Sequence, residues 1–425
     1  MANSLTSNYA RKLLEQFLID METQRVLSKS VNTQLFSGKF NPSSGPVIDV
    51  KRPHRYKALR TSGGDISAET PNTIISGKAT ATVQNYITVK IPYTNYEEAL
   101  ELNQLSEITK PAAEECVTEL ETSFADYMLL NTGLAWGDPD VAVTKWSHLA
   151  GPMALMKSIG VPGNELNYAM NPYIATNLAD TQSGLASGDN ELVNLAWKKA
   201  QISNNFAGLN AFSCDSLSNF TTGAASDREG TLSASPVVTY SNAKDTMTQQ
   251  LAVTAFTAAA VIKAGSVIEL PASHYIHQRT RRAFLDQAGN AVPFRATVTA
   301  DVTLGASGEG TLVVTGPAVY EAGAAGQYNN VDVAPVSGAV IKVLGTASTL
   351  YQPNLFYHKN AFTITTVKLP KLHATDARVV SKDGIAIRVT KYSDGDKNEQ
   401  NIRFDMLPAF GTLNPFFAGK GFGAA

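Results

Sequence analysis

The chain has 425 residues, with 35 Lys and Arg against 37 Asp and Glu, so its formal net charge is -2. This length exceeds the roughly 250–300 residues at which one hydrophobic core stops growing, which predicts more than one domain. Hydrophobic residues make up 44% and charged residues 17%, a composition too apolar for a disordered chain and too weakly charged for a free nucleic-acid-binding protein.

Targeting and redox features are sparse. No apolar stretch is long enough for a membrane-spanning helix, so we expect no membrane partner. The first 20 residues carry Arg11 and Lys12 in an amphipathic pattern and lack a signal-peptide cleavage site, so no secretory signal is expected. Cys116 and Cys214 are too few for a disulfide framework, and we predict buried thiols in a reducing cytoplasm.

The N-terminal segment predicts an amphipathic helix, with apolar residues at helical spacing at Leu13, Leu14, Phe17, Leu18 and Met21. Residues 1–60 contain ten Lys and Arg and four Asp and Glu, a balance of +6, so the remainder carries -2 - 6 = -8. Such segregated charge predicts complementary partners.

An extended hairpin is predicted from strand-like residues 47–50 and 80–92, which flank a long polar, Gly-rich stretch. A lone two-stranded hairpin is marginal in water, so we expect it to lie against another chain. Its first strand runs into the basic residues 51–57. These could contact phosphate, form a solvated strand face, or pair with an acidic face of a neighbouring copy, and the projecting position favours the third interpretation.

A long helix is predicted from Pro111 to about Thr132, with Thr109 as N-cap, Pro111 in the first turn and Gly133 just beyond the end. Residues 144–217 then have an α+β pattern. The predicted helices there are 146–159, one opened by Asn171 and Pro172, and 189–200, and the predicted strands are 168–170 and 211–214.

From residue 218 to 348 the helical period disappears, and short strand-like runs alternate with turn residues. The runs are 237–240, 251–254, 267–270, 296–302, 311–315 and 339–343. This pattern predicts an all-β barrel or sandwich. Because an α+β pattern resumes at Pro353, the β segment is predicted to be an insertion. Three last strands are predicted at 377–380, 385–392 and 400–407.

Candidate chemical sites are all weak. The glycine-rich residues 305–310 lack the strand-to-helix context of a nucleotide site, and His274 and His277 lack further metal ligands nearby. Glu399 stands where a calcium loop needs Gly, and the SxxK match at Ser241 lacks its partner motifs. We therefore predict no catalytic, cofactor-binding or metal-binding residues, and the chain is not expected to be an enzyme.

Short motifs throughout the chain follow the order of one known family. They include Lys51-Arg52-Pro53-His54, residues 59–61, 64–67, 75–80, 85–89, 102–105, 144–147, 369–373 and 387–389, Lys391-Tyr392-Ser393-Asp394-Gly395-Asp396 and Arg403-Phe404-Asp405-Met406-Leu407-Pro408-Ala409. With these motifs the chain resembles the major coat protein of short-tailed lambdoid phages that infect enteric bacteria.

The resemblance implies an α+β Hong Kong 97-like phage capsid fold with an inserted all-β barrel domain. The implied parts are an N-terminal arm at 1–45, an extended loop hairpin at 46–92, a peripheral domain with a spine helix at 93–140, an axial domain at 141–217, the inserted barrel at 218–348, and return strands of both domains at 349–425.

The resemblance also implies the function of a major capsid protein. Its copies would form pentamers and hexamers of an icosahedral head, assembled in the host cytoplasm around a scaffolding protein, with a portal protein at one vertex. The head would expand as double-stranded DNA enters, and this DNA would be bound non-specifically at the inner face of the virion shell. The alternative is another β-rich virion component, such as a tail or adhesion protein.

Two groups of basic residues are the candidate sites. The expected inter-subunit contacts are Lys51, Arg52, Arg55, Arg60, Lys78, Arg281 and Arg282. The expected inner-face arm residues are Arg11, Lys12, Arg25 and Lys29.

Overall fold

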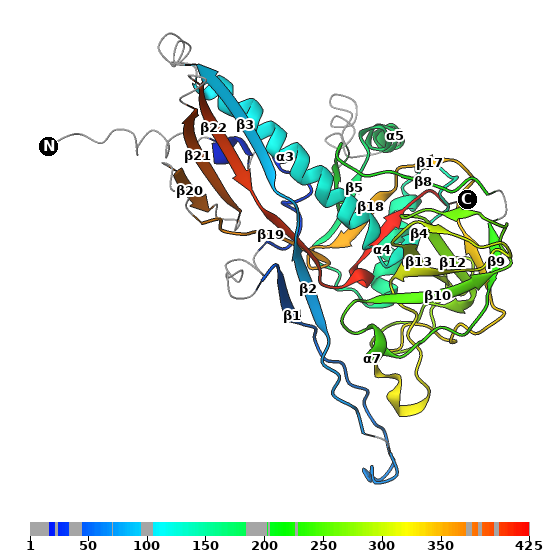
Figure 1. The fold of residues 1–425 in the computed structure, drawn as a ribbon. Helices are drawn as coiled ribbons and strands as arrows, with labels where there is room; N and C mark the ends of the chain where they lie inside the picture. The colour runs from blue at the N-terminus through cyan, green and yellow to red at the C-terminus, as the bar shows by residue number, and fades with distance from the viewer. Residues whose placement is uncertain are drawn as a thin grey trace. The chain divides into compact units, whose positions relative to one another are not determined.

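The computed structural model describes residues 17–21, 24–33, 45–69, 71–94, 105–183, 202, 205–225, 228–370, 376–380, 385–394 and 399–424 (Figure 1). The chain forms two compact units. The first comprises Met1–Asp49, Thr80–Ala125 and Phe362–Thr412, and the second comprises Val50–Ala79, Asp126–Ala361 and Leu413–Ala425.

Two four-stranded sheets belong mainly to the first unit. One has the order β20-β21-β22-β3, with β20 (Asp376–Val380), β21 (Ala386–Asp394), β22 (Glu399–Met406) and β3 (Ile87–Thr94), and all its pairs are antiparallel. The other has the order β1-β2-β23-β19, with β1 (Val47–Lys51), β2 (Lys78–Val83), β23 (Pro408–Thr412) and β19 (Phe362–Thr366). The strands predicted near residues 47, 80, 377, 385 and 400 are confirmed.

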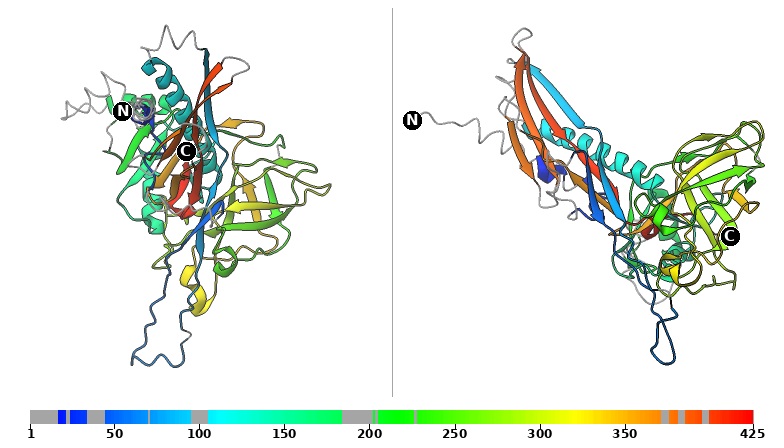
Figure 2. Two further views of the ribbon diagram at one scale, coloured as in Figure 1. Left: turned by 60° about the vertical axis from the view of Figure 1, so that its left-hand side comes forward. Right: turned by 60° about the horizontal axis from the view of Figure 1, so that its bottom comes forward.

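The long helix α3 (Leu105–Leu130) runs along the sheet that contains β3 and β22 (Figures 1 and 2). Its buried residues, among them Val117, Leu120 and Phe124, recur at helical spacing. The predicted start is wrong, because the helix begins at Leu105 and Pro111 lies inside it. Pro111 removes one backbone hydrogen bond, but Ala112 and Ala113 beside it are buried, so tertiary packing stabilises the helix through the proline.

A buried ion network stabilises the sheet beneath α3. Asp405 on β22 is fully buried and accepts hydrogen bonds from Arg388 Nη2 and Arg403 Nε, both at 2.6 Å, and from Thr88 Oγ1 at 2.8 Å. Burial alone would raise the pKa of Asp405, but the bonds from Arg388, Arg403 and Thr88 hold it below its usual value. The network therefore joins three strands, β21, β22 and β3.

The second unit contains a six-stranded mixed sheet in the order β4-β24-β18-β5-β7-β6. Its strands are β4 (Leu134–Trp136), β24 (Ala418–Gly421), β18 (Asn354–His358), β5 (Leu166–Met170), β7 (Leu209–Ser213) and β6 (Asn205–Phe206). Two of the helices predicted between residues 144 and 217 are confirmed, α4 (Ser147–Ile159) and α5 (Pro172–Ser183). Asn171 Oδ1 accepts the Tyr173 N–H at 2.9 Å as the predicted cap. The helix predicted at 189–200 lies outside the described residues.

The predicted β segment contains a closed barrel in the order β10-β15-β13-β12-β16-β9. Its strands are β9 (Glu229–Leu232), β10 (Thr248–Thr254), β12 (Val267–His274), β13 (Pro293–Val298), β15 (Gly310–Thr315) and β16 (Val340–Val343). The strand predicted at 237–240 is wrong, because Tyr240 begins the short helix α7 (Tyr240–Ala243). The Tyr240 ring stacks on Tyr328, with ring centroids 3.7 Å apart, and this packing overrides the β propensity of the run.

The two ends of the β segment meet. Strand β8 (Phe220–Thr221), which follows β7, pairs with β17 (Leu350–Tyr351), which precedes β18. The pairs β7–β5 and β5–β18 place the flanking strands in the same host sheet. The barrel is therefore inserted between two strands of that sheet.

A buried lysine lies where the host sheet meets the barrel. Lys420 on β24 is fully buried, its Nζ donates to the Gly265 carbonyl at 2.5 Å, and it lies 5.1 Å from the centroid of the Phe220 ring. Burial lowers the pKa of Lys420 well below its usual value. Gly265 and Phe220 both lie at the base of the barrel segment, so Lys420 connects the base to the sheet.

Candidate functional site

Residues 52–77 form the extended hairpin of the second unit, which projects past the barrel (Figures 1 and 2). The Arg52 N–H donates to the Gly77 carbonyl at 2.8 Å at its base. Farther out, Lys57 and Asn72 exchange two hydrogen bonds of 2.8 Å between the Lys57 backbone and the Asn72 amide. Residues 62–69 at the tip are all exposed.

Arg52, a predicted inter-subunit residue, is buried within its own chain. Its Nε donates to the carbonyls of Lys78 at 3.0 Å and Lys244 at 3.1 Å, and its Nη1 donates to the carbonyl of Leu413. Burial lowers the pKa of this guanidinium. Arg52 therefore ties the hairpin base to the turn after α7 and to the C-terminal segment.

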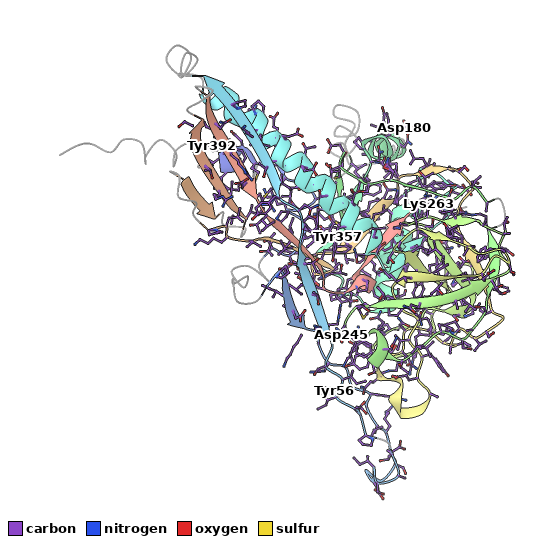
Figure 3. The ribbon with its side chains drawn as sticks, in the orientation of Figure 1. Tyr56, Asp180, Asp245, Lys263, Tyr357 and Tyr392 are labelled. Carbon is purple, nitrogen blue, oxygen red and sulfur yellow. The ribbon has the colours of Figure 1, made fainter. Side chains whose placement is uncertain are left out.

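Three more basic residues of the predicted set join the hairpin to the barrel. Arg55 Nη2 donates to Gln278 Oε1 at 2.7 Å, and its backbone N–H donates to the Tyr328 hydroxyl at 3.2 Å. From the barrel side, Arg281 donates through Nη2 to the Tyr56 carbonyl at 3.3 Å. Lys78 also takes part, because its N–H donates to Asp245 Oδ1 at 3.1 Å. Figure 3 marks Tyr56 and Asp245 on these two facing segments.

The barrel residues that receive the hairpin were missed by sequence reasoning. Gln278 and Tyr328 accept from Arg55, and Gln327 Nε2 donates to the Thr73 carbonyl at 2.6 Å. These are uncharged polar residues with no motif around them, so no signal in the sequence identifies them.

Only part of the predicted contact set is available to another molecule. The side chains of Lys51, Arg60 and Arg282 are exposed and form no hydrogen bond or ion pair within the described part of the chain. Within each copy, these three are the candidates left for an electrostatic contact with a second molecule.

The predicted arm residues divide in the same way. Arg11 and Lys12 lie outside the described residues. Arg25 is 3% exposed, and its Nε donates to Ser28 Oγ at 2.8 Å, whereas Lys29 is exposed. The arm is held by Glu121 on α3, which accepts the Leu27 N–H at 2.6 Å, the Ser28 N–H at 3.0 Å and the Ser28 hydroxyl.

The solvent-facing side of α3 is acidic. Glu115, Glu119 and Asp126 are exposed, and their spacing of four and seven residues places them on one face of the helix. None of them forms an ion pair with a described residue, although Glu119 accepts from Ser123 Oγ and Asp126 from Ser218 Oγ. This face offers negative charge to a basic partner.

The described residues show no metal site and no reactive thiol. Among the residues that the structure describes, no group of three or more His, Cys, Asp or Glu could hold a metal ion. Cys116 is buried, and burial, then Glu115 and Asp405, raise its pKa to about 12, so it is unreactive. No described helix is both long and apolar enough to cross a membrane.

Comparisons with known proteins give the family. Residues 1–423 match the family described as P22 coat protein, gene protein 5. The chain is 40% identical over 428 residues to the "Major capsid protein" of Acyrthosiphon pisum secondary endosymbiont phage 1, and the match covers 100% of both chains.

Two solved structures are also similar. A chain from Mycobacterium phage Che8 is 12% identical, with 93% of this chain and 90% of that chain covered and a TM-score of 0.48. A chain from the capsid structure of Cyanophage P-SCSP1u is 9% identical, with 90% and 84% covered and a TM-score of 0.42.

The family matches span the whole chain, and the α+β architecture with a closed, inserted barrel is the one expected of this family. The predicted α+β fold class with an inserted all-β barrel is confirmed. The chain belongs to the P22 coat protein family and is a structural coat protein of a bacteriophage capsid.

Proposed function

We propose that many copies of this chain form the pentamers and hexamers of an icosahedral phage head. The copies assemble in the host cytoplasm around a scaffolding protein, with a portal protein at one vertex, and the shell expands as it takes up double-stranded DNA. The parts of each copy are the arm at 1–45, the hairpin at 46–92, the peripheral segment at 93–140, the axial segment at 141–217, the inserted barrel at 218–348 and the return strands at 349–425.

The observation that supports shell assembly is the exposed hairpin. Its outer part carries exposed apolar side chains, with Ile66 57% and Ile74 69% exposed. A two-stranded extension with apolar residues in water gains stability only when another surface covers it. A second copy supplies such a surface, and contacts that close under rotation generate rings.

Charge indicates where the hairpin binds. Two exposed cations lie at this end of the molecule, Arg60 on the hairpin and Lys51 at the end of β1 just before it. Glu115 and Glu119 form part of the acidic face of α3. We assign the hairpin of one copy to the α3 face of the next. Each such contact is weak at the surface, which suits a shell that must correct errors while it assembles.

Reciprocal charge reversal tests this assignment. Arg60→Glu and Glu119→Arg should each give a folded monomer that forms few shells when co-expressed with the scaffolding protein of the same phage, because like charges then face each other. The double variant should recover shells, counted by sedimentation and electron microscopy. Normal shell yields from both single variants would exclude the contact, and small fixed oligomers of the wild type would exclude the head function itself.

A further inference from the structure

A pocket of about 690 Å³ lies in the second unit where the hairpin meets the barrel. Its walls include residues 56–58 of the hairpin, residues 279–281 of the turn after β12, and the 3-10 helix Gly323–Tyr328. It therefore exists only because the hairpin is held on the barrel of its own chain.

Three cations line the pocket, and none of them forms an ion pair with a described carboxylate. Lys57, Arg279 and Arg281 line it, and Arg55 lies close to the two arginines. Within the described ranges, none of the four forms an ion pair. Lys57 and Arg281 donate to carbonyl oxygens, and Arg55 donates to the Gln278 amide. A group of cations that form no ion pair within their own chain offers a site to an anion.

The two acidic residues of the pocket do not fill this role. Asp332 accepts both the backbone N–H and the ring Nδ1 of His274, at 2.8 and 2.9 Å. Glu321 has a raised pKa whose cause is burial alone, with no contribution from a basic residue. The lining therefore carries three cations, Lys57, Arg279 and Arg281, against two carboxylates, and neither carboxylate forms an ion pair with any of the three.

We propose that this pocket binds a carboxylate-bearing segment of a second copy of the chain, with Arg279 as the residue that selects it. The Arg279 side chain is exposed at the pocket and makes no hydrogen bond to a described residue. A guanidinium binds a carboxylate through two parallel hydrogen bonds. A second copy can supply the carboxylate, because residues 61–425 of each copy carry a net charge of -8. The inference rests on the proposed function, since a shell places copies side by side.

The turn itself provides a matched control. Arg282 is also exposed and also lacks a partner among the described residues, but it does not line the pocket. Arg279→Glu should lower the yield of closed shells at least tenfold, whereas Lys145→Glu, at an exposed lysine that does not line the pocket, should leave it within twofold of the wild type. Arg282→Glu is the control for anion binding by the monomer, because Arg282 is itself a candidate contact between copies. Arg279→Lys should retain part of the yield, because it keeps the charge and loses the paired donors. Thermal unfolding of each monomer shows whether the variants fold; if Arg279→Glu does not, Arg279→Gln replaces it.

A second measurement does not depend on shells. Citrate at constant ionic strength should raise the thermal midpoint of the wild-type monomer and of Arg282→Glu, but not that of Arg279→Glu. Equal shell yields from folded Arg279→Glu and Lys145→Glu, or the same citrate response in the wild type, Arg282→Glu and Arg279→Glu, would overturn the pocket assignment. A wild type that responds to citrate but forms no shells would count against the proposed function and leave the anion site standing.

Discussion

The N-terminal arm is attached to α3 through the buried carboxylate of Glu121, which is 3% exposed and accepts from Leu27 and Ser28. The exposed Glu114 adds one hydrogen bond, from Gln24 Nε2 at 3.0 Å. Replacing Glu121 with Ala leaves the Leu27 and Ser28 N–H groups, both buried, without an acceptor. Each orphaned buried donor costs about 1–3 kcal/mol, so Glu121→Ala should lower the free energy of unfolding by about 2–6 kcal/mol. Glu121→Gln retains one acceptor oxygen and should lose roughly half as much.

Urea unfolding of the monomer at pH 7 measures the loss, and hydrogen exchange at Leu27 and Ser28 localises it. Glu119→Ala on the exposed side of the same helix is the control and should change stability by less than about 0.5 kcal/mol. If Glu121→Ala and Glu119→Ala lower the free energy of unfolding by the same small amount, or if hydrogen exchange at Leu27 and Ser28 stays slow in Glu121→Ala, the Glu121 carboxylate does not hold the arm.

The same residue predicts a pH dependence with a definite sign. Burial raises the pKa of Glu121 above its usual 4.5, despite hydrogen bonds from Ser28 and Leu27 and the charge of Arg25. The folded chain then binds this proton more tightly than the unfolded chain. The stability that this proton adds to the folded chain is fully present below pH 4.5, and it is lost as pH rises through the folded-state pKa of Glu121. The Glu121→Gln variant should lack this slope in a pH series of urea unfolding curves.

Three further substitutions test the packing. Asp405→Asn should lower the free energy of unfolding by about 3–5 kcal/mol, because it leaves the buried Arg388 without its ion pair. Since the pKa of Asp405 is lowered in the folded chain, the wild type should lose the same stability as pH falls below 3.8, which acid unfolding measures. Lys420→Met should leave the stability in thermal unfolding unchanged or raise it by about 1 kcal/mol. Because burial lowers the pKa of Lys420 in the folded chain, the wild type gains stability as pH rises toward 10.5, so the difference between variant and wild type should shrink. Gly308→Ala should destabilise the barrel by more than about 2 kcal/mol, because a Cβ there would lie 1.9 Å from the Phe256 carbonyl oxygen. Gly289→Ala is the control, since Gly289 also has a positive φ but faces open space, and it should cost about 1 kcal/mol. Equal shifts of the melting temperature would contradict this difference.

Local patterns predicted most of the elements, because helices and strands bury one face with a fixed period. Helix α4 was predicted from residue 146 and begins at Ser147, and the run at 311–315 lies within β15. Helix α3 shows the limit of this reasoning. Its proline indicated a start at Pro111, but packing of the neighbouring alanines carries the helix six residues farther toward the N-terminus.

The partners of the basic run could not be predicted, because they are distant in the sequence. Arg55 and Gln278 are 223 residues apart, and the Lys78 N–H and Asp245 are 167 apart. A cluster of positive charge indicates that something polar lies opposite, but not whether it belongs to the same chain. Arg52 has the same charge as Lys51, and only the fold decides that Arg52 is buried while Lys51 faces solvent.

The β8–β17 pair has a consequence for how this coat protein could have acquired its barrel. The chain enters and leaves the barrel through residues that are hydrogen-bonded neighbours, Phe220 with Tyr351 and Thr221 with Leu350. A short turn joining these two strands would close the host sheet without moving β7 or β18. The junction is therefore one place where a segment of another length or sequence can replace the barrel, provided that it covers the apolar host residues, such as Leu134 and Phe356, that share a core with the barrel.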